Sequence, residues 1–305
     1  MRSLATAVVL ALATSMVGTS ACSSDPDSIH PGRPATGRDA DANPGSKDGG
    51  TPEGSSASGS GPGPTAEAEG GGPSTGASKP NCKYQAHKTG LTQLQQADGL
   101  SFNVYAPMTY DANVGHTVVV IMHGQDSNGV PELNAFWKSI ADNPQDHLVL
   151  VAPKGSRAAT NGDANAGNWA TADLDKVLAI MMLVDDCYDV FPNKHILWGF
   201  SEGTFYGYLL GIGAADRFSG LAMGGANTSF ARQNGYPPSA ATWKIPVSDV
   251  HGTADPNPIS LTYQDRTDFQ ALGHVFTLHE HTGGHTISAA QVVSQYDDVK
   301  ASSSP

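Results

Sequence analysis

The chain has 305 residues, and its 29 acidic and 17 basic side chains give a formal net charge of −12. Basic residues are not concentrated in any segment, which argues against nucleic acid as a partner. The length is sufficient for one large α/β domain and a terminal extension.

The first 21 residues are typical of an export signal. A positively charged start is followed by an apolar run, residues 4–17, that is too short to predict a membrane span. Residues 19–22, Thr-Ser-Ala-Cys, resemble a bacterial lipobox, so we expect Cys22 to be lipidated and to hold the exported protein in the cell envelope. Ordinary cleavage after Ala21, which would give a secreted protein, is the alternative.

The next segment, residues 22–80, has the composition of a disordered linker. Between positions 23 and 80, Gly, Pro and Ser account for 32 of 58 residues, and Ile29 is the only large apolar side chain. Such a segment cannot bury enough apolar surface to offset the entropy lost on ordering. The sequence therefore predicts a signal peptide, this linker and one folded domain from 81 to 305.

Within the folded domain, apolar runs alternate with helical patterns. The expected strands are 101–106, 117–122, 148–152, 196–198, 221–223, 245–250 and 275–279, and the expected helices are 131–141, 173–189, 261–272 and 288–296. The run at 117–122 is continuous and mostly β-branched, as in a strand buried on both faces. The alternation predicts an α/β fold with a mainly parallel sheet and helices on both faces. Sites in such sheets form at the carboxyl ends of strands.

Residues 199–203, Gly-Phe-Ser-Glu-Gly, match the pattern Gly-x-Ser-x-Gly. They follow an apolar run and precede a helix-like run, which is the context of a nucleophile elbow. In an elbow, only glycine fits two positions before and after the serine, because a Cβ there would strike the neighbouring strand or helix. Ser201 is therefore the predicted nucleophile, and a glycine-bracketed surface turn is the alternative.

A serine hydroxyl becomes a good nucleophile when a base takes its proton, and the base is normally a histidine oriented by a carboxylate. In the α/β-hydrolase order, the acid and then the histidine follow the serine. Asp255 lies in a glycine-containing loop after a predicted strand, and it is the predicted acid, with Asp249 as the weaker alternative. His285 follows a strand and two glycines, and it is the predicted base, with His281 as its rival.

The same C-terminal segment also permits a metal-site interpretation. His279 and His281 alternate along a predicted strand, so both would face one side, and His285 could be a third zinc ligand. No cysteine or separate acidic cluster completes such a set, and we predict no metal.

Hydrolysis through a serine also needs two backbone N–H donors for the oxyanion. The expected donors are Glu202, directly after the nucleophile, and Gln125, in the loop after the 117–122 strand. His123 and Trp169 are candidate substrate-contacting residues. For His123 the alternative is packing within its loop, and for Trp169 it is covering the domain core.

The three cysteines are Cys22, Cys82 and Cys187. If Cys22 carries lipid, the other two can pair in an oxidising compartment. Such a bridge would join the start of the folded domain to the end of a central helix.

With these residues in place, the domain resembles the secreted α/β-hydrolase esterases that include polyhydroxybutyrate depolymerases, feruloyl esterases and acetyl xylan esterases. The matching pieces are residues 118–124, 173–189, 196–203, 251–256 and 283–285. The resemblance implies a triad of Ser201, Asp255 and His285, an oxyanion hole at Gln125 and Glu202, and no cofactor.

Other positions agree or disagree with this group. Cys82 and Cys187 are similar to bridged positions in some members. Thr204 follows the elbow glycine where the group often has Gly or Ala, and residues 286–288 do not supply the tryptophan that often follows the histidine. The resemblance therefore bears on the reaction class more than on the substrate.

We therefore expect an exported serine carboxylic-ester hydrolase that forms an acyl-enzyme on polyester or plant-polysaccharide-type esters. Its expected partner is an ester substrate, small or polymeric, together with a membrane if Cys22 is acylated. A serine peptidase of the same fold and a tethered, non-catalytic binding protein are the alternatives.

Overall fold

The computed structural model describes residues 82, 89–95 and 100–302, without the side chains of residues 95, 192 and 193. The predicted signal peptide, the lipidation site Cys22 and the linker lie outside the described residues and stay predictions. Within the described part of the chain, every helix is too short or too polar to span a bilayer.

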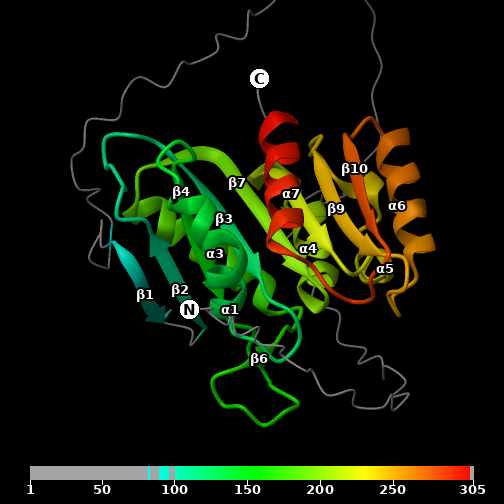
Figure 1. Cartoon of the computed structure of the whole chain (residues 1–305), viewed down its shortest axis with the longest axis horizontal. Helices are drawn as coiled ribbons and strands as arrows, with labels where there is room; N and C mark the ends of the chain where they lie inside the picture. Colours follow the sequence, from blue (N-terminus) through cyan, green and yellow to red (C-terminus); the bar gives the residue numbers. More distant parts are fainter. Residues whose placement is uncertain (1–81, 83–88, 96–99, 303–305) are drawn as a thin grey trace, which may run out of the picture. The chain divides into compact units, whose positions relative to one another are not determined.

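Eight strands form the central sheet: β1 (Gly90–Gln95), β2 (Ser101–Ala106), β3 (His116–Met122), β4 (Leu148–Pro153), β7 (Val190–Phe200), β8 (Phe218–Gly224), β9 (Val247–Gly252) and β10 (Phe276–His281). Their order is β1-β2-β4-β3-β7-β8-β9-β10, so β1 and β10 lie at opposite edges (Figure 1). β2 pairs antiparallel with β1 and β4, whereas the other neighbouring pairs are parallel. This confirms the predicted mainly parallel sheet.

The main helices are α1 (Val130–Glu132), α2 (Lys138–Ala141), α3 (Asp173–Cys187), α4 (Glu202–Gly213), α5 (Ser229–Gln233), α6 (Ile259–Ala271) and α7 (Ala289–Ser302). Between α1 and α2, a π-helical turn (Leu133–Trp137) continues the same helical segment, which was expected as one helix. α3 ends two residues earlier than predicted, because Tyr188 is already in an extended conformation. A second, two-stranded sheet pairs β5 (Arg157–Ala158) with β6 (Gly167–Asn168).

Side chains of the central strands alternate between two apolar layers. On β3, Val118, Val120 and Met122 join the cluster that contains side chains of α3 and α4. Val119 and Ile121 join the other cluster, with side chains of α2 and α7. Successive side chains of a strand point to opposite faces, so the continuous apolar run of β3 supplies both layers. The predicted cover of helices on both faces is thus present.

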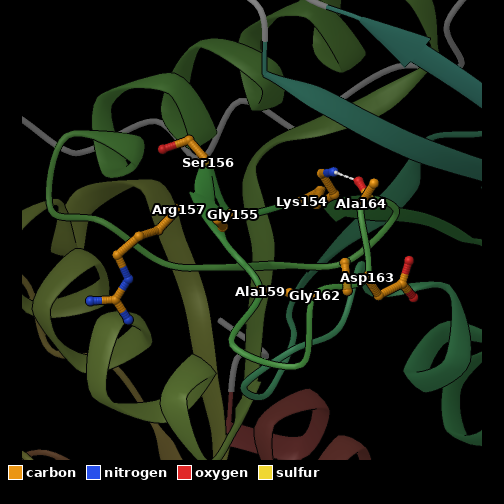
Figure 2. A pocket seen from close by; sticks show the side chains of 10 residues that line it. Lys154, Gly155, Ser156, Arg157, Ala159, Gly162, Asp163 and Ala164 are labelled. Atoms are coloured by element: carbon orange, nitrogen blue, oxygen red, sulfur yellow. Dashed lines mark hydrogen bonds between the residues drawn. The ribbon is translucent and has the colours of Figure 1, made fainter.

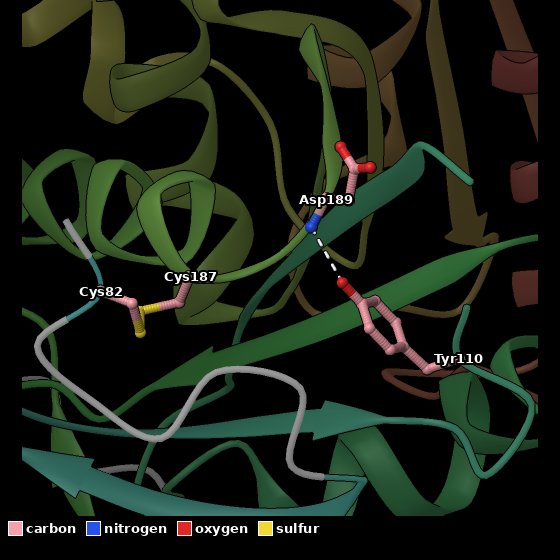
Figure 3. The surroundings of a disulfide bond; sticks show 4 residues. All are labelled: Cys82, Tyr110, Cys187 and Asp189. Carbon is pink, nitrogen blue, oxygen red and sulfur yellow. Dashed lines mark hydrogen bonds between the residues drawn. A yellow bond between two sulfur atoms is a disulfide. The ribbon is translucent and has the colours of Figure 1, made fainter. Parts of the chain in front are cut away.

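A disulfide joins Cys82 to Cys187, 105 residues later in the chain (Figure 3). Cys187 is the last residue of α3 and is buried, so the bridge ties the start of the domain to the core. Beside the bridge, the backbone N–H of Asp189 donates to the Tyr110 hydroxyl at 2.9 Å. The pairing that cysteine arithmetic suggested is therefore present in the structure.

Candidate active site

Ser201 occupies a sharp turn between β7 and α4, with a φ of 59°. A positive φ is strained for a residue other than glycine, and it persists where surrounding structure enforces it. Here the backbones approach closely: a Cβ on Gly203 would lie 2.0 Å from the Met122 carbonyl oxygen of β3, and a Cβ on Gly199 would lie 2.5 Å from the Gly203 carbonyl oxygen. Both positions therefore require glycine, because a Cβ at either one would clash with neighbouring backbone, as the motif predicts.

Thr204 stands where the esterase group that the sequence resembles often has Gly or Ala. Its side chain hydrogen-bonds the turn to the neighbouring strand β8. Its buried hydroxyl lies 2.8 Å from the Gly199 carbonyl oxygen and 2.7 Å from that of Gly224, at the end of β8. It also accepts the Gly224 N–H at 3.0 Å. The Ser201 N–H donates to the same Gly224 carbonyl at 2.9 Å. The threonine therefore adds hydrogen bonds at the elbow that Gly or Ala could not make.

The three residues predicted as nucleophile, acid and base lie in one hydrogen-bonded chain. His285 Nε2 lies 2.7 Å from Ser201 Oγ, and His285 Nδ1 lies 2.8 Å from Asp255 Oδ2. With the proton on Nδ1, the imidazole donates to Asp255 Oδ2 and Nε2 accepts the serine hydroxyl. The geometry thus accommodates the tautomer that a general base requires.

Neighbouring groups hold the side chains of Asp255 and His285 in place. The Asp255 side chain is almost fully buried, and its Oδ1 accepts the Asn257 N–H at 2.8 Å. The acid loop is bonded to the histidine loop, because the Ala254 N–H donates to the Gly283 carbonyl at 3.1 Å. Phe200 lies against the imidazole of His285, with ring centroids 5.0 Å apart. The Asp255 and His285 side chains thus have fixed positions relative to the elbow.

The rival residues have other partners. Asp249 is fully buried on β9 and accepts the Tyr208 hydroxyl at 2.6 Å, and burial raises its pKa well above the ordinary value. His281 Nδ1 accepts the Gly283 N–H at 3.1 Å. His279 Nε2 lies 2.6 Å from Asp298 Oδ2. These contacts leave Asp255 and His285 as the pair that meets Ser201.

The imidazoles of the metal-site interpretation do not converge. His279 bonds to a carboxylate on α7, whereas His285 bonds to Asp255 and Ser201. Over the residues that the structure describes, no group of three or more His, Cys, Asp or Glu side chains has a metal-binding arrangement.

The loop after β3 lies beside the nucleophile. A Cβ placed on Gly124 would lie 3.7 Å from Ser201 Cβ, so Gln125 begins within one residue of the reacting group. Among the described residues, the Gln125 backbone N–H donates no hydrogen bond. Glu202 is the first residue of α4, where backbone N–H groups have no acceptor within the helix.

His123, the first residue of this loop, and Trp169 pack on each other. Both are fully buried, their rings stack at 4.6 Å, and Trp169 Nε1 donates to the His123 carbonyl at 2.9 Å. Burial lowers the pKa of His123 to about 4, so its imidazole is neutral near pH 7, and its Nε2 accepts the Gly155 N–H at 3.0 Å. This geometry favours the packing alternative for both residues over substrate contact.

The Glu202 side chain contacts the segment that ends at Trp169, including Arg157, for which the sequence predicted no role. Its Oε1 lies 2.6 Å from Arg157 Nη2, and its Oε2 accepts the Trp169 N–H at 3.3 Å. Burial raises the pKa of this carboxyl, against the opposing effects of the Trp169 N–H and the Arg157 guanidinium. The start of α4 is thus linked to residues 155–169, which we call the 155–169 segment.

Figure 2 shows most of this segment around a small pocket that Arg157 lines on one side. Lys154 closes the other side, where its Nζ donates to the Ala164 carbonyl at 3.1 Å. In this segment, the sequence predicted a role for Trp169 alone. Arg157 and Asn168 belong to no motif that places them near Ser201. Asp126, which contacts Asn168, follows Gln125 in the predicted oxyanion loop, but the sequence predicted no role for it.

Comparison of the sequence found no matching family model and no matching curated protein. Solved structures do match. Esterase PE8 aligns with a TM-score of 0.53 and 16% identity over 70% of this chain and 99% of its own. A ferulic acid esterase from Anaeromyces mucronatus, in complex with ferulic acid, aligns with a TM-score of 0.52 and 15% identity over 71% and 91%.

A feruloyl esterase module from Clostridium thermocellum, complexed with sinapinate, gives a TM-score of 0.52 and 14% identity over 74% of this chain and 92% of its own. The chain spans 61% of the length of a thermostable esterase that it also matches, with a TM-score of 0.51. At these identities the likeness establishes the fold, which is that of the α/β hydrolases.

Proposed function

We propose that the protein is a serine carboxylic-ester hydrolase. The observation that carries this proposal is the hydrogen-bonded chain from Asp255 through His285 to Ser201, at the carboxyl edge of an α/β-hydrolase sheet. The names of the similar structures, which are esterases and feruloyl esterases, support the same reaction class.

Acylation begins when Ser201 Oγ attacks the ester carbonyl carbon and His285 Nε2 takes the hydroxyl proton. Asp255 accepts the Nδ1–H throughout and stabilises the imidazolium that forms. The carbonyl oxygen becomes an oxyanion, which accepts hydrogen bonds from the Gln125 and Glu202 backbone amides. Each such donor stabilises the transition state by about 3 kcal/mol.

The tetrahedral intermediate collapses when the bond to the alcohol oxygen breaks and His285 donates its proton to that oxygen. A water then enters, His285 takes its proton, and the resulting hydroxide attacks the acyl carbonyl. Collapse of the second intermediate releases the acid and returns the proton to Ser201. Water is the only co-reactant that the cycle uses.

We further propose that the enzyme is exported, that it is lipid-anchored through Cys22, and that its substrates are polyester or plant-polysaccharide-type esters. Export and anchoring are supported by the sequence of residues 1–22. The substrate class is supported by the sequence resemblance and by the feruloyl esterases among the similar structures.

The test is a hydrolysis panel on the purified 81–305 domain and its Ser201→Ala variant. The panel contains short-chain nitrophenyl esters, methyl ferulate, acetylated xylan, a hydroxybutyrate polymer and a peptide substrate. We expect turnover of at least one ester, with a loss of about 10⁴-fold or more in the variant, because the nucleophile is removed. Equal ester turnover by the folded variant, or turnover of the peptide alone, would contradict the proposal.

A further inference from the structure

Asp126, the residue after Gln125, has a φ of 56°. This left-handed conformation is uncommon outside glycine, although Asp adopts it more readily than most residues, and here several contacts hold it. Asp126 belongs to the loop that lies beside Ser201, so the contacts that enforce its conformation also set the path of that loop.

Asn168 of β6 makes a closed pair of hydrogen bonds with Asp126. Its Oδ1 accepts the Asp126 backbone N–H at 2.8 Å, and its Nδ2 donates to Asp126 Oδ1 at 2.9 Å. The same Nδ2 lies 3.1 Å from the Ala158 carbonyl, and the Asn168 side chain is buried. The carboxamide therefore bonds with both its donor and its acceptor ends.

Thr160 completes the set of donors around the Asp126 carboxylate. Its backbone N–H donates to Oδ1 at 2.6 Å, and its hydroxyl donates to Oδ2 at 2.5 Å. Desolvation of the Asp126 carboxyl acts to raise its pKa, but the hydrogen bonds from Thr160 and Asn168 outweigh it and lower the pKa. The carboxylate thus keeps its charge at neutral pH and acts as an acceptor only.

The 155–169 segment holds the same loop at two more places. The His123 carbonyl accepts Trp169 Nε1–H, and the Ser127 carbonyl accepts the Gly167 N–H at 2.8 Å. The loop is therefore fixed on both sides of Gln125. Since the segment also bonds to the Glu202 carboxylate, it connects the two residues whose amides are the proposed oxyanion donors.

We propose that Asp126 and Asn168 are positioning residues, which direct the Gln125 backbone amide toward the oxyanion through their mutual hydrogen bonds. The proposal rests on the proposed ester hydrolysis. Both residues act through the loop and neither contacts the reacting atoms. Without the hydrogen bonds between Asp126 and Asn168, Asp126 can leave its left-handed conformation. The Gln125 backbone N–H then no longer points toward the oxyanion.

The test uses Asp126→Asn and Asn168→Ala in the 81–305 domain, with Asp163→Asn as the matched control. Asn at 126 keeps the shape but places a donor group against donors, and Ala at 168 removes both hydrogen bonds. Asp163 lies in the same segment and is exposed, and among the described residues its carboxylate accepts only the Asn165 N–H. The control thus removes one carboxylate charge from the segment without touching the pair.

We expect kcat to fall about 10- to 100-fold in both variants with KM changed little, because a misdirected donor is lost chiefly in the transition state. Affinity for a trifluoromethyl ketone, which forms an oxyanion on the nucleophile, should fall in the same proportion as kcat/KM. The control should match the wild type in both measurements. General loosening of the fold would not produce this proportional loss.

Wild-type kcat and wild-type inhibitor affinity in Asp126→Asn would overturn the inference, and so would a fall in kcat without a matching fall in affinity. Melting curves establish that the variants are folded, and the isosteric Asp126→Asn decides the matter if Asn168→Ala does not fold. Ser201 dependence of the wild type is measured in parallel. If ester hydrolysis does not depend on Ser201, the proposed hydrolysis itself is overturned. If it depends on Ser201 but Asp126→Asn and Asn168→Ala behave as the wild type, this inference alone is overturned.

Discussion

At the scale of single residues, the structure explains why Ser201 can hold a strained conformation. The Ser201 N–H and the Thr204 hydroxyl both bond at Gly224, and the Gly203 backbone lies against β3. The elbow is thus hydrogen-bonded to β8 and packed against β3, the two strands that flank β7. The strain is offset by contacts that form only when β3, β7 and β8 are all in place.

A second residue-scale feature is the carboxyl group of Asp249, whose burial favours the neutral, protonated form. Tyr208 donates to Oδ2, and Oδ1 has no hydrogen-bond partner in the described structure. Because burial raises its pKa well above 3.8, folding retains a proton that the unfolded chain loses. Its contribution to stability is complete below the ordinary carboxyl pKa and is lost as pH rises through the raised value.

We therefore predict that Asp249→Asn becomes more stable relative to the wild type as pH rises from about 4. The free energy of unfolding of the wild type should fall, relative to the variant, by at most about 1.4 kcal/mol per pH unit. Urea unfolding of both proteins between pH 4 and 8 measures the difference. Two curves that stay parallel over this range would show that Asp249 is ionised in the folded state.

At the scale of elements, the long, strongly patterned segments could be predicted from the sequence. β2 has the predicted bounds, and β3 begins one residue earlier than expected. β7 starts at Val190, six residues before the predicted strand, because the position of its first part depends on pairing with β3. β1 and the short β5–β6 pair were not predicted, since an edge strand and two-residue strands carry little apolar pattern.

The residues of the candidate site likewise divide into those that the sequence could predict and those that it could not. Ser201, Asp255 and His285 each follow a strand, and chain order assigns them their roles, so motif reasoning could select them. Asp126 and Asn168 are 42 residues apart, and neither lies in a motif. Their relation depends on how the 155–169 segment folds against the β3 loop, which is a tertiary contact that no local pattern reports.

The disulfide gives a prediction at the element scale. It closes a loop of 105 residues between the domain start and the end of α3. Removing it with Cys82→Ala and Cys187→Ala together should lower the free energy of unfolding by about 2–4 kcal/mol, because the unfolded chain gains conformational freedom.

Denaturant unfolding of the double variant, beside the reduced and the oxidised wild type, measures this loss. The reduced wild type is the matched control, because it keeps both side chains. Unchanged stability in the variant and in the reduced protein would contradict a stabilising role for the bridge.

At the scale of the whole molecule, the predicted lipid anchor decides where the domain works. Cys22 lies outside the described residues, and its lipidation stays a prediction from the lipobox-like sequence before it. Expressed in a bacterial host with its signal, the wild-type chain should yield a mature N-terminus at residue 22 that carries acyl mass and partitions with membranes. Cys22→Ala should abolish both, and a free Cys22 amine without acyl mass in the wild type would contradict the prediction.

The central claim is that one serine, activated by His285, attacks carbonyl substrates. Reaction of the folded domain with a fluorophosphonate ester, followed by intact-mass and peptide mass spectrometry, tests it most directly. We predict one adduct per chain, located on Ser201, absent from Ser201→Ala and formed far more slowly in His285→Ala. An adduct on another residue, or equal labelling of Ser201→Ala, would contradict it.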